Sequence, residues 1–444
     1  MTAAAPDIAP PATDPPKGGT KRRTSATQAV LGPWIRAQAL NLVRHTTALR
    51  DFSREEFGTG PEAPTEGHVF AVNRDLTRLR KGLTRRARRM VQLAAEAQAT
   101  PSPERLTMLV THKHHAHDWV KGIEKIWDFY FELFGQRQSR FGTWLLSTDR
   151  IALDCYQVTY LGIGNEKSVP APPPFCYMRT GFGPATFKRG VRLRQLGLQL
   201  NPFPLIQLPY HRLVNPWTLG AVLHEVSHNT QNDLGLSRAV PLAIARALLS
   251  AGLGEQVARV WVRWNRETWA DLCGLLLGGP AVVASLMDVV GRSPRITYHF
   301  DPNGVHPTPY LRVLISVELL RRMGFEAEAK KYARAWMTLY PGPPAGAFPK
   351  EILLTAPRVI ALVVDALCYR PFAEIGNKTL AEVYRFGQKE QRMIEECAQR
   401  LAMGTDPGIV PERFLIGAAR YALDNRLARA GAIREGFYRE LARR

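Results

Sequence analysis

The sequence predicts a mainly α-helical (α+β) protein with one small β-sheet. From residue 216 to the end of the chain, apolar residues recur every three to four positions, which is the spacing of one face of an α-helix. Only two short segments have the composition of strands, FCYMRTGF (175–182) and PLIQLPYHRL (204–213). A chain of 444 residues also suggests two or three parts, although one large domain with helical additions would fit as well.

The N-terminal third is expected to begin as a disordered tail and to continue as helices. Residues 1–27 are rich in Pro and Ala and lack the apolar stretch of a secretory signal. Short helices over 28–56 and a Gly/Pro-rich linker over 57–67 should follow. Two long helices are predicted near 69–98 and 103–135, with a break at Thr100-Pro101-Ser102-Pro103.

The rest of the chain should be almost wholly helical. A helix is predicted over 141–165, and the later helices are predicted near 216–233, 239–251, 254–278, 281–290, 309–323, 325–340, 348–370, 378–402, 412–428 and 430–443. The most apolar stretch, residues 272–287, is shorter than a membrane span and is broken at Gly278-Gly279-Pro280. It therefore predicts two buried helices and no transmembrane segment.

Composition limits the classes of function. The formal net charge of +20 makes contact with an acidic partner, nucleic acid or an anionic membrane physically reasonable, without selecting among them. The five cysteines are far apart, odd in number and never arranged as CxxC. This pattern argues against a disulfide framework or a cysteine zinc site and favours a reducing, cytoplasmic compartment.

The stretch NPWTLGAVLHEVSHNTQNDLG contains two histidines four residues apart, His224 and His228, with Glu225 between them. Asn215 and Pro216 suit the start of a helix, and Gly235 suits its end. Residues one turn apart on a helix share a face, so both imidazoles can reach one metal ion. The alternative is an ordinary amphipathic helix: its buried stripe would be Leu219, Val222, Leu223 and Val226, and its polar residues would face outward.

A second helix carries two carboxylates, Glu267 and Asp271, again one turn apart and within an apolar segment. Buried carboxylates need a cation or hydrogen-bond donors, and a zinc ion would supply the cation. Glu267 would then be the third metal ligand, and Asp271 would accept a hydrogen bond from one of the histidines. The alternative is an exposed Glu267 beside Arg266.

HEVSH, followed 39 residues after His228 by ETWAD, resembles the zinc signature of the gluzincin metallopeptidases, HExxH with a downstream ExxxD. The resemblance implies the zinc ligands His224, His228 and Glu267, the catalytic base Glu225, and Asp271 as a hydrogen-bond partner of a ligand. It also implies a zincin-like metallohydrolase core.

Four parts are accordingly expected along the chain. They are a disordered tail with short helices and a linker (1–66), a helical hairpin with a basic face (67–140), the zincin-like core (141–325) and a C-terminal helical region (326–444).

The expected activity is zinc-dependent hydrolysis of a peptide or protein substrate. Three ligands leave one position on zinc for water, and Glu225 would take a proton from that water during attack on a carbonyl. The oxyanion needs a further donor, for which we favour His306, followed by Tyr298 or Tyr310, all in a Pro/Gly-rich loop. The same loop could instead be purely structural.

An alternative function rests on the basic helix 73–89, NRDLTRLRKGLTRRARR. The chain could be a zincin-derived interaction or regulatory module that binds an acidic partner or nucleic acid through this helix. No stacking aromatic motif accompanies the arginines, so nucleic acid is not the partner we expect. The helix could also be one member of a hairpin with a solvated basic face.

Overall fold

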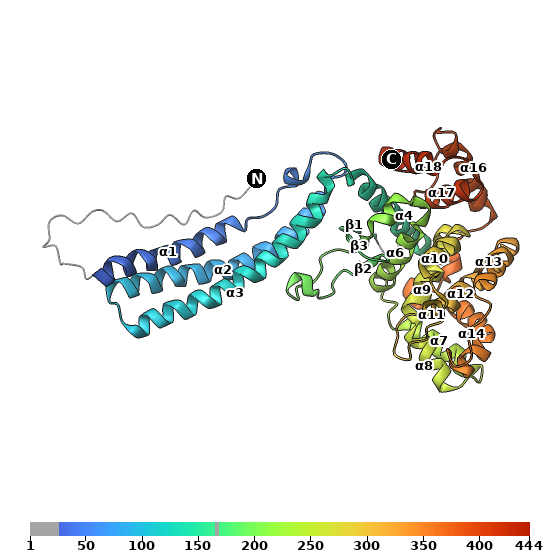
Figure 1. The fold of residues 1–444 in the computed structure, drawn as a ribbon, viewed down its shortest axis with the longest axis horizontal. Helices are drawn as coiled ribbons and strands as arrows, with labels where there is room; N and C mark the ends of the chain where they lie inside the picture. Colours follow the sequence, from blue (N-terminus) through green and yellow to red (C-terminus); the bar gives the residue numbers. More distant parts are fainter. Residues whose placement is uncertain (1–25, 165–167) are drawn as a thin grey trace. The chain divides into compact units, whose positions relative to one another are not determined.

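The computed structural model describes residues 26–164 and 168–444, and it confirms a mainly helical chain with a small three-stranded sheet (Figure 1). The tail predicted over 1–27 lies almost wholly outside the described residues. The described residues divide into two compact units: 26–50 with 79–121, and 51–78 with 122–164 and 168–444. The division into two units does not test the four parts predicted from the sequence, which stay a prediction.

The first unit is built from helix α1 (Ala26–Ala48) and from parts of α2 (Glu66–Ala99) and α3 (Pro103–Gly135). Both long helices have nearly the bounds predicted for them. The Trp119 ring of α3 lies over Gly82 of α2, where a Cβ atom would come within 2.6 Å of the indole. The ring of His112 donates to the carbonyl oxygen of Arg86 at 2.8 Å, which also ties α3 to α2.

The sheet belongs to the second unit and has the strand order β1-β3-β2. Its strands are β1 (Phe175–Met178), β2 (Ala185–Phe187) and β3 (Leu205–Leu208); β1 runs parallel and β2 antiparallel to β3. The two predicted strands are present but shorter, and β2 was not predicted. Pro209 has no amide hydrogen to continue the ladder, and the chain turns there into the short helix α5.

The remaining helices agree with most of the predicted ranges. Their bounds are α4 (Gly142–Ile163), α5 (Tyr210–Val214), α6 (Gly220–Asp233), α7 (Ala239–Ser250), α8 (Glu255–Arg263), α9 (Asn265–Gly278), α10 (Ala281–Val290), α11 (Pro294–Thr297), α12 (Pro309–Arg322), α13 (Glu326–Leu339), α14 (Lys350–Cys368), α15 (Leu380–Tyr384), α16 (Gln388–Ala402), α17 (Phe414–Asp424) and α18 (Ala430–Arg443). Within the described residues, none of the helices is both long and apolar enough to span a bilayer.

Two ranges that were each predicted as one helix contain two separate helices. The range 254–278 breaks between α8 and α9, where the Asn265 side chain donates to the carbonyl oxygen of Val262 at 2.7 Å and competes with the helical backbone bonds. The range 378–402 breaks between α15 and α16, where Arg385 is left-handed (φ 43°) and Phe386 is buried against Gly279.

The start of the HEVSH helix also differs from the prediction. Residues Pro216–Thr218 form a 3₁₀ turn, and the α-helix begins at Gly220. The Asn215 side chain does not cap this helix, since its amide donates instead to the carbonyl oxygen of His211 at 3.0 Å. Gly235, with φ +78°, follows the end of the helix in the left-handed conformation, as expected.

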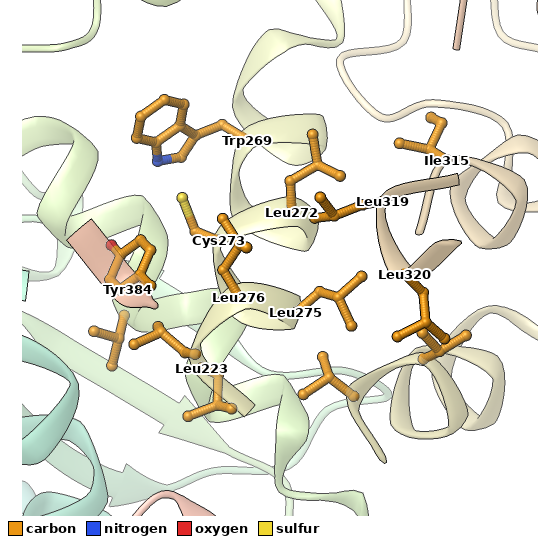
Figure 2. Close-up of a cluster of buried hydrophobic side chains, with 14 of the residues drawn as sticks. Leu223, Trp269, Leu272, Cys273, Leu275, Leu276, Ile315, Leu319, Leu320 and Tyr384 are labelled. Carbon is orange, nitrogen blue, oxygen red and sulfur yellow. The ribbon is translucent and has the colours of Figure 1, made fainter. Parts of the chain in front are cut away.

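Helices α6 and α9 pack against each other in antiparallel directions. His228 lies beside Glu267, His224 beside Asp271, and Leu223 beside Gly278. The apolar stripe of α6, Leu219, Val222, Leu223 and Val226, is completely buried as predicted. Figure 2 shows the core beneath this pair, where side chains of α6, α9, α12 and α15 meet; the labelled ones are Leu223, Trp269, Leu272, Cys273, Leu275, Leu276, Ile315, Leu319, Leu320 and Tyr384.

Gly274 sets how closely α6 and α9 approach. A Cβ atom at this position would lie 3.4 Å from the backbone nitrogen of His224, which leaves room for a methyl group and for nothing larger. We expect Gly274→Val to destabilise the protein by about 1–3 kcal/mol, because its Cγ atoms would push α6 away.

Gly274→Ala is the matched control and should be neutral or stabilising, since alanine has a helix propensity about 1 kcal/mol better than that of glycine. Urea unfolding of the three proteins measures the difference. Equal stability of the valine and alanine variants would mean that this contact does not limit the approach of the helices.

Candidate metal centre

The polar face of α6 and one face of α9 line the same cavity, whose volume is about 600 Å³. His224, Glu225 and His228 reach it from α6, and Glu267 and Asp271 reach it from α9. The helical repeat brings the first three together, and the antiparallel contact with α9 adds the two carboxylates. The structure thus brings five of the predicted site residues to one place.

Three of these side chains form a compact set of donor atoms. The Nε2 atoms of His224 and His228 are 3.1 Å apart; that of His224 lies 3.3 Å from Oε2 of Glu267, and that of His228 lies 3.3 Å from Oε1. A tetrahedral ion with bonds of about 2.0–2.1 Å needs ligand atoms about 3.3 Å apart. The observed distances are close to this value, although each histidine is nearest to a different oxygen of Glu267, and one donor atom from each residue lies within 4.8 Å of the other two.

Asp271 holds His224 in one orientation. Its Oδ1 atom accepts a hydrogen bond from Nδ1 of His224 at 2.8 Å, which leaves Nε2 of the same ring free to bind a metal. Arg312 in the first turn of α12 donates to both Asp271 oxygens, from Nε at 2.7 Å and from Nη2 at 2.8 Å. Asp271 is thereby fixed from two sides, and the pKa of its carboxyl group stays below its usual value, since Arg312 and His224 outweigh the effect of burial.

The groups around the donor set favour a divalent cation. Glu225, Glu267 and Asp271 carry three negative charges when ionised, and Arg312, which contacts Asp271 and Glu267, supplies one positive charge, so these four groups keep two negative charges. Lys188, Arg263 and Arg266 also line the cavity, without an ion pair to these carboxylates. In the metal-free chain protons reduce this excess. Burial alone lowers the pKa of His224, but hydrogen bonds to Asp271 and Glu267 raise it to about 10. A cation of charge two would remove the need for such protons.

Glu225 lies in the cavity but outside the donor set. Its side chain is buried, and no donor atom of it joins the group formed by His224, His228 and Glu267. Burial is the main reason that the pKa of Glu225 is raised to about 7. The pKa of a general base that works near neutral pH is best placed close to that value.

The loop residues predicted to contact the oxyanion divide into two groups. His306 lines the cavity, with Nε2 3.5 Å from a Glu267 oxygen and a side chain that is 63% exposed, so it is free to meet a substrate. Tyr298 does not line the cavity: it is buried, and its hydroxyl accepts a hydrogen bond from the amide of Gly342 at 3.0 Å. Tyr310 is also buried, and its ring packs on that of Tyr298.

Sequence reasoning missed the role of Arg312. Arg312 directly precedes an apolar helical run, VLISVELL, where a cation needs an acidic partner. That signal could have paired Arg312 with Asp271. Thr186 of β2 was also missed: its hydroxyl accepts from the Asn229 amide of α6 at 2.7 Å, and a three-residue strand leaves no pattern to find.

The predicted basic helix is part of α2 and is amphipathic as expected. Its apolar positions Leu76, Leu83 and Met90 are buried, and most of its arginines are exposed. The guanidinium of Arg86 stacks over the Trp119 ring at 3.9 Å, which gives this residue a structural contact. A partner for the exposed face stays a prediction.

Comparisons with protein-family models, with curated proteins and with solved structures found no match. The site is therefore interpreted from its own residues.

Metal binding at this site should release protons. At pH 8–9 His224 still carries the proton that its pKa of about 10 retains, whereas His228, whose pKa burial lowers to about 4, carries none. Zinc must displace the His224 proton, so its apparent Kd should fall by up to about tenfold per pH unit in this window.

Titration with chelator-buffered zinc in buffers of different ionisation enthalpy measures both the affinity and the protons released. Asp271→Asn removes the strongest contribution that raises the pKa of His224 and should reduce the proton release. A Kd that stays constant between pH 8 and pH 9 would mean that zinc displaces no proton from His224 in this range.

Proposed function

We propose that this protein is a zinc-dependent peptidase of gluzincin type, with a zincin-like core around α6 and α9. The observation that carries the proposal is the convergence of the His224, His228 and Glu267 side chains, with one donor atom from each within 4.8 Å of the other two, beside a buried carboxylate that does not belong to the donor set. The resemblance of HEVSH and ETWAD to the gluzincin signature assigns the same residues the same roles. The five unpaired, buried cysteines are in keeping with the cytoplasmic location that we propose with it.

His224, His228 and Glu267 would hold the zinc ion, and Asp271 with Arg312 would keep His224 in its binding orientation. When bound, zinc would supply Lewis acidity toward a carbonyl oxygen and toward water. The three donors come from two adjacent helices, so the ion would also join α6 to α9.

Glu225 would act as the general base. From its buried position on the cavity wall it would take a proton from the water that attacks the peptide carbonyl, and it would then return the proton to the leaving amine. His306, exposed at the cavity and next to Glu267, would donate to the oxyanion. We do not assign this role to Tyr298, whose hydroxyl is engaged with the backbone at Gly342.

Glu225→Gln should separate catalysis from metal binding. The variant keeps the size of the side chain and loses the proton acceptor, so hydrolysis should fall by about two to four orders of magnitude. Zinc content and melting temperature should stay near those of the wild type, because Glu225 is not one of the donors. Peptide hydrolysis, metal analysis and thermal unfolding on the same preparations check this; an empty site in Glu225→Gln would contradict it.

Substitutions of Glu267 and Asp271 on α9 should affect zinc binding, unlike Glu225→Gln, and should do so to different extents. Glu267→Gln removes an anionic donor and should lower zinc affinity and stability together. Asp271→Asn should weaken zinc about ten- to a hundredfold, the usual scale for a residue that orients a ligand.

Metal analysis of protein purified without added zinc gives the direct test. We expect about one zinc ion per chain in the wild-type protein and loss of this zinc in the His224→Ala variant. A wild-type protein without metal, or full zinc and activity in Glu267→Gln, would overturn the proposal.

A further inference from the structure

Three basic side chains line the cavity without an acidic partner. Lys188 follows β2, Arg263 ends α8, and Arg266 lies in the first turn of α9. Among the described residues, none of the three has a hydrogen bond or an ion pair with another side chain. Burial lowers the pKa of Lys188, and the charge of Arg266 lowers it further, whereas the carboxylates Glu267, Asp233 and Glu225 act in the opposite direction.

Arg266 and Lys188 act on each other electrostatically, and Arg263 ends the helix just before α9, three residues ahead of Arg266. Residues Arg266, Glu267, Asp271, Gly274 and Leu275 of α9 all line the cavity, so this helix runs along its wall. At 1.5 Å per residue, the nine steps from Arg266 to Leu275 span about 13 Å, with Glu267 and Asp271 between them.

The opposite end of the cavity is apolar. It is lined by Leu275 and by Val282, Val283, Leu286 and Val289 of α10. Helix α6 runs the other way, so His228 lies near the basic end and Gly220, which contacts Ser285 of α10, lies at the apolar end. A molecule bound along this cavity would meet cations at one end and an apolar wall at the other.

The metal centre does not need these cations. Its three carboxylates are balanced by Arg312 and a divalent ion, so the metal centre does not require Lys188, Arg263 or Arg266, none of which forms an ion pair in the described part of the chain. Grouped cations beside a reactive centre bind an anion through charge-assisted hydrogen bonds, and guanidinium groups match the two oxygens of a carboxylate.

Building on the peptidase function above, we infer that the substrate is a peptide that carries a carboxylate a few residues from the bond to be cleaved. Lys188, Arg263 and Arg266 bind this carboxylate, and an apolar side chain of the same peptide occupies the α10 end. The carboxylate can belong to an Asp or Glu side chain or to the peptide C-terminus, since both offer the same chemistry.

Binding of short fluorescent peptides to the full-length protein tests this without requiring turnover. One series has blocked ends and a central leucine followed by Glu, Gln or Lys. A second series has no acidic side chain and ends in a free carboxylate or an amide. Carboxylate peptides should bind about ten- to a hundredfold more tightly than their amide counterparts, with a preference that weakens as salt is added. Preference in the first series identifies a side-chain carboxylate, and preference in the second identifies the C-terminus.

Charge reversal locates the binding site. Lys188→Glu combined with Arg266→Glu should abolish the preference for the carboxylate, and Arg263→Glu alone should reduce it. Arg259→Glu is the matched control, because Arg259 lies one turn before Arg263 on the same helix and is not part of the cavity wall. This control should bind like the wild type.

The outcomes separate this inference from the peptidase function. Equal binding of carboxylate and amide peptides, or a preference that survives the Lys188 and Arg266 reversal, overturns the inference even if the protein cleaves peptides. A preference that the reversal abolishes upholds carboxylate binding, and if no peptide is then cleaved, the peptidase function alone fails.

Discussion

The close antiparallel approach of α6 and α9 is the constraint on which the candidate site depends. Glu267 comes from a different helix than His224 and His228, so its 3.3 Å distances to the two imidazoles depend on how closely the helices approach. Small residues permit that approach: Gly274 faces the backbone of His224, and at Gly278 a Cβ atom would come within 2.6 Å of Leu223. A side chain larger than alanine at Gly274 would push the two halves of the site apart.

Electrostatics then determine which cation the site can accept. The carboxylates lie above a tightly filled apolar core, where an uncompensated charge is costly. Arg312 compensates for one charge through two hydrogen bonds to Asp271, and it reaches the site from α12, whose other face packs into the same core. Hydrogen bonds therefore connect Arg312 of α12 to Asp271, and Asp271 to His224. The orientation of a candidate metal donor thus depends on the position of a third helix.

The sequence predicted the parts of this arrangement that depend on local spacing. The buried stripe of α6 follows from helical periodicity, and so do the shared face of His224 and His228 and the pairing of Glu267 with Asp271 on α9. The features that it did not predict depend on contacts between distant segments. Arg312 is 41 residues from Asp271 in the chain, and β2 exists only because β3 pairs with it. The break between α8 and α9 depends on one side-chain hydrogen bond, from Asn265 to Val262, which periodicity does not reveal.

The break between α8 and α9 also places part of the basic lining of the cavity on a different helix from the candidate metal donors. Arg263 ends α8 and Lys188 follows β2, so two of the three cations lie on segments other than the helices that carry the metal donors. Under the proposed function, substitutions at Lys188 or Arg263 would change substrate selection while α6, α9 and their glycine contacts remain unchanged. Arg266 is the exception, because it is the neighbour of Glu267 on α9. The proposed selectivity and the candidate metal centre are thus encoded largely, though not entirely, in different stretches of the chain.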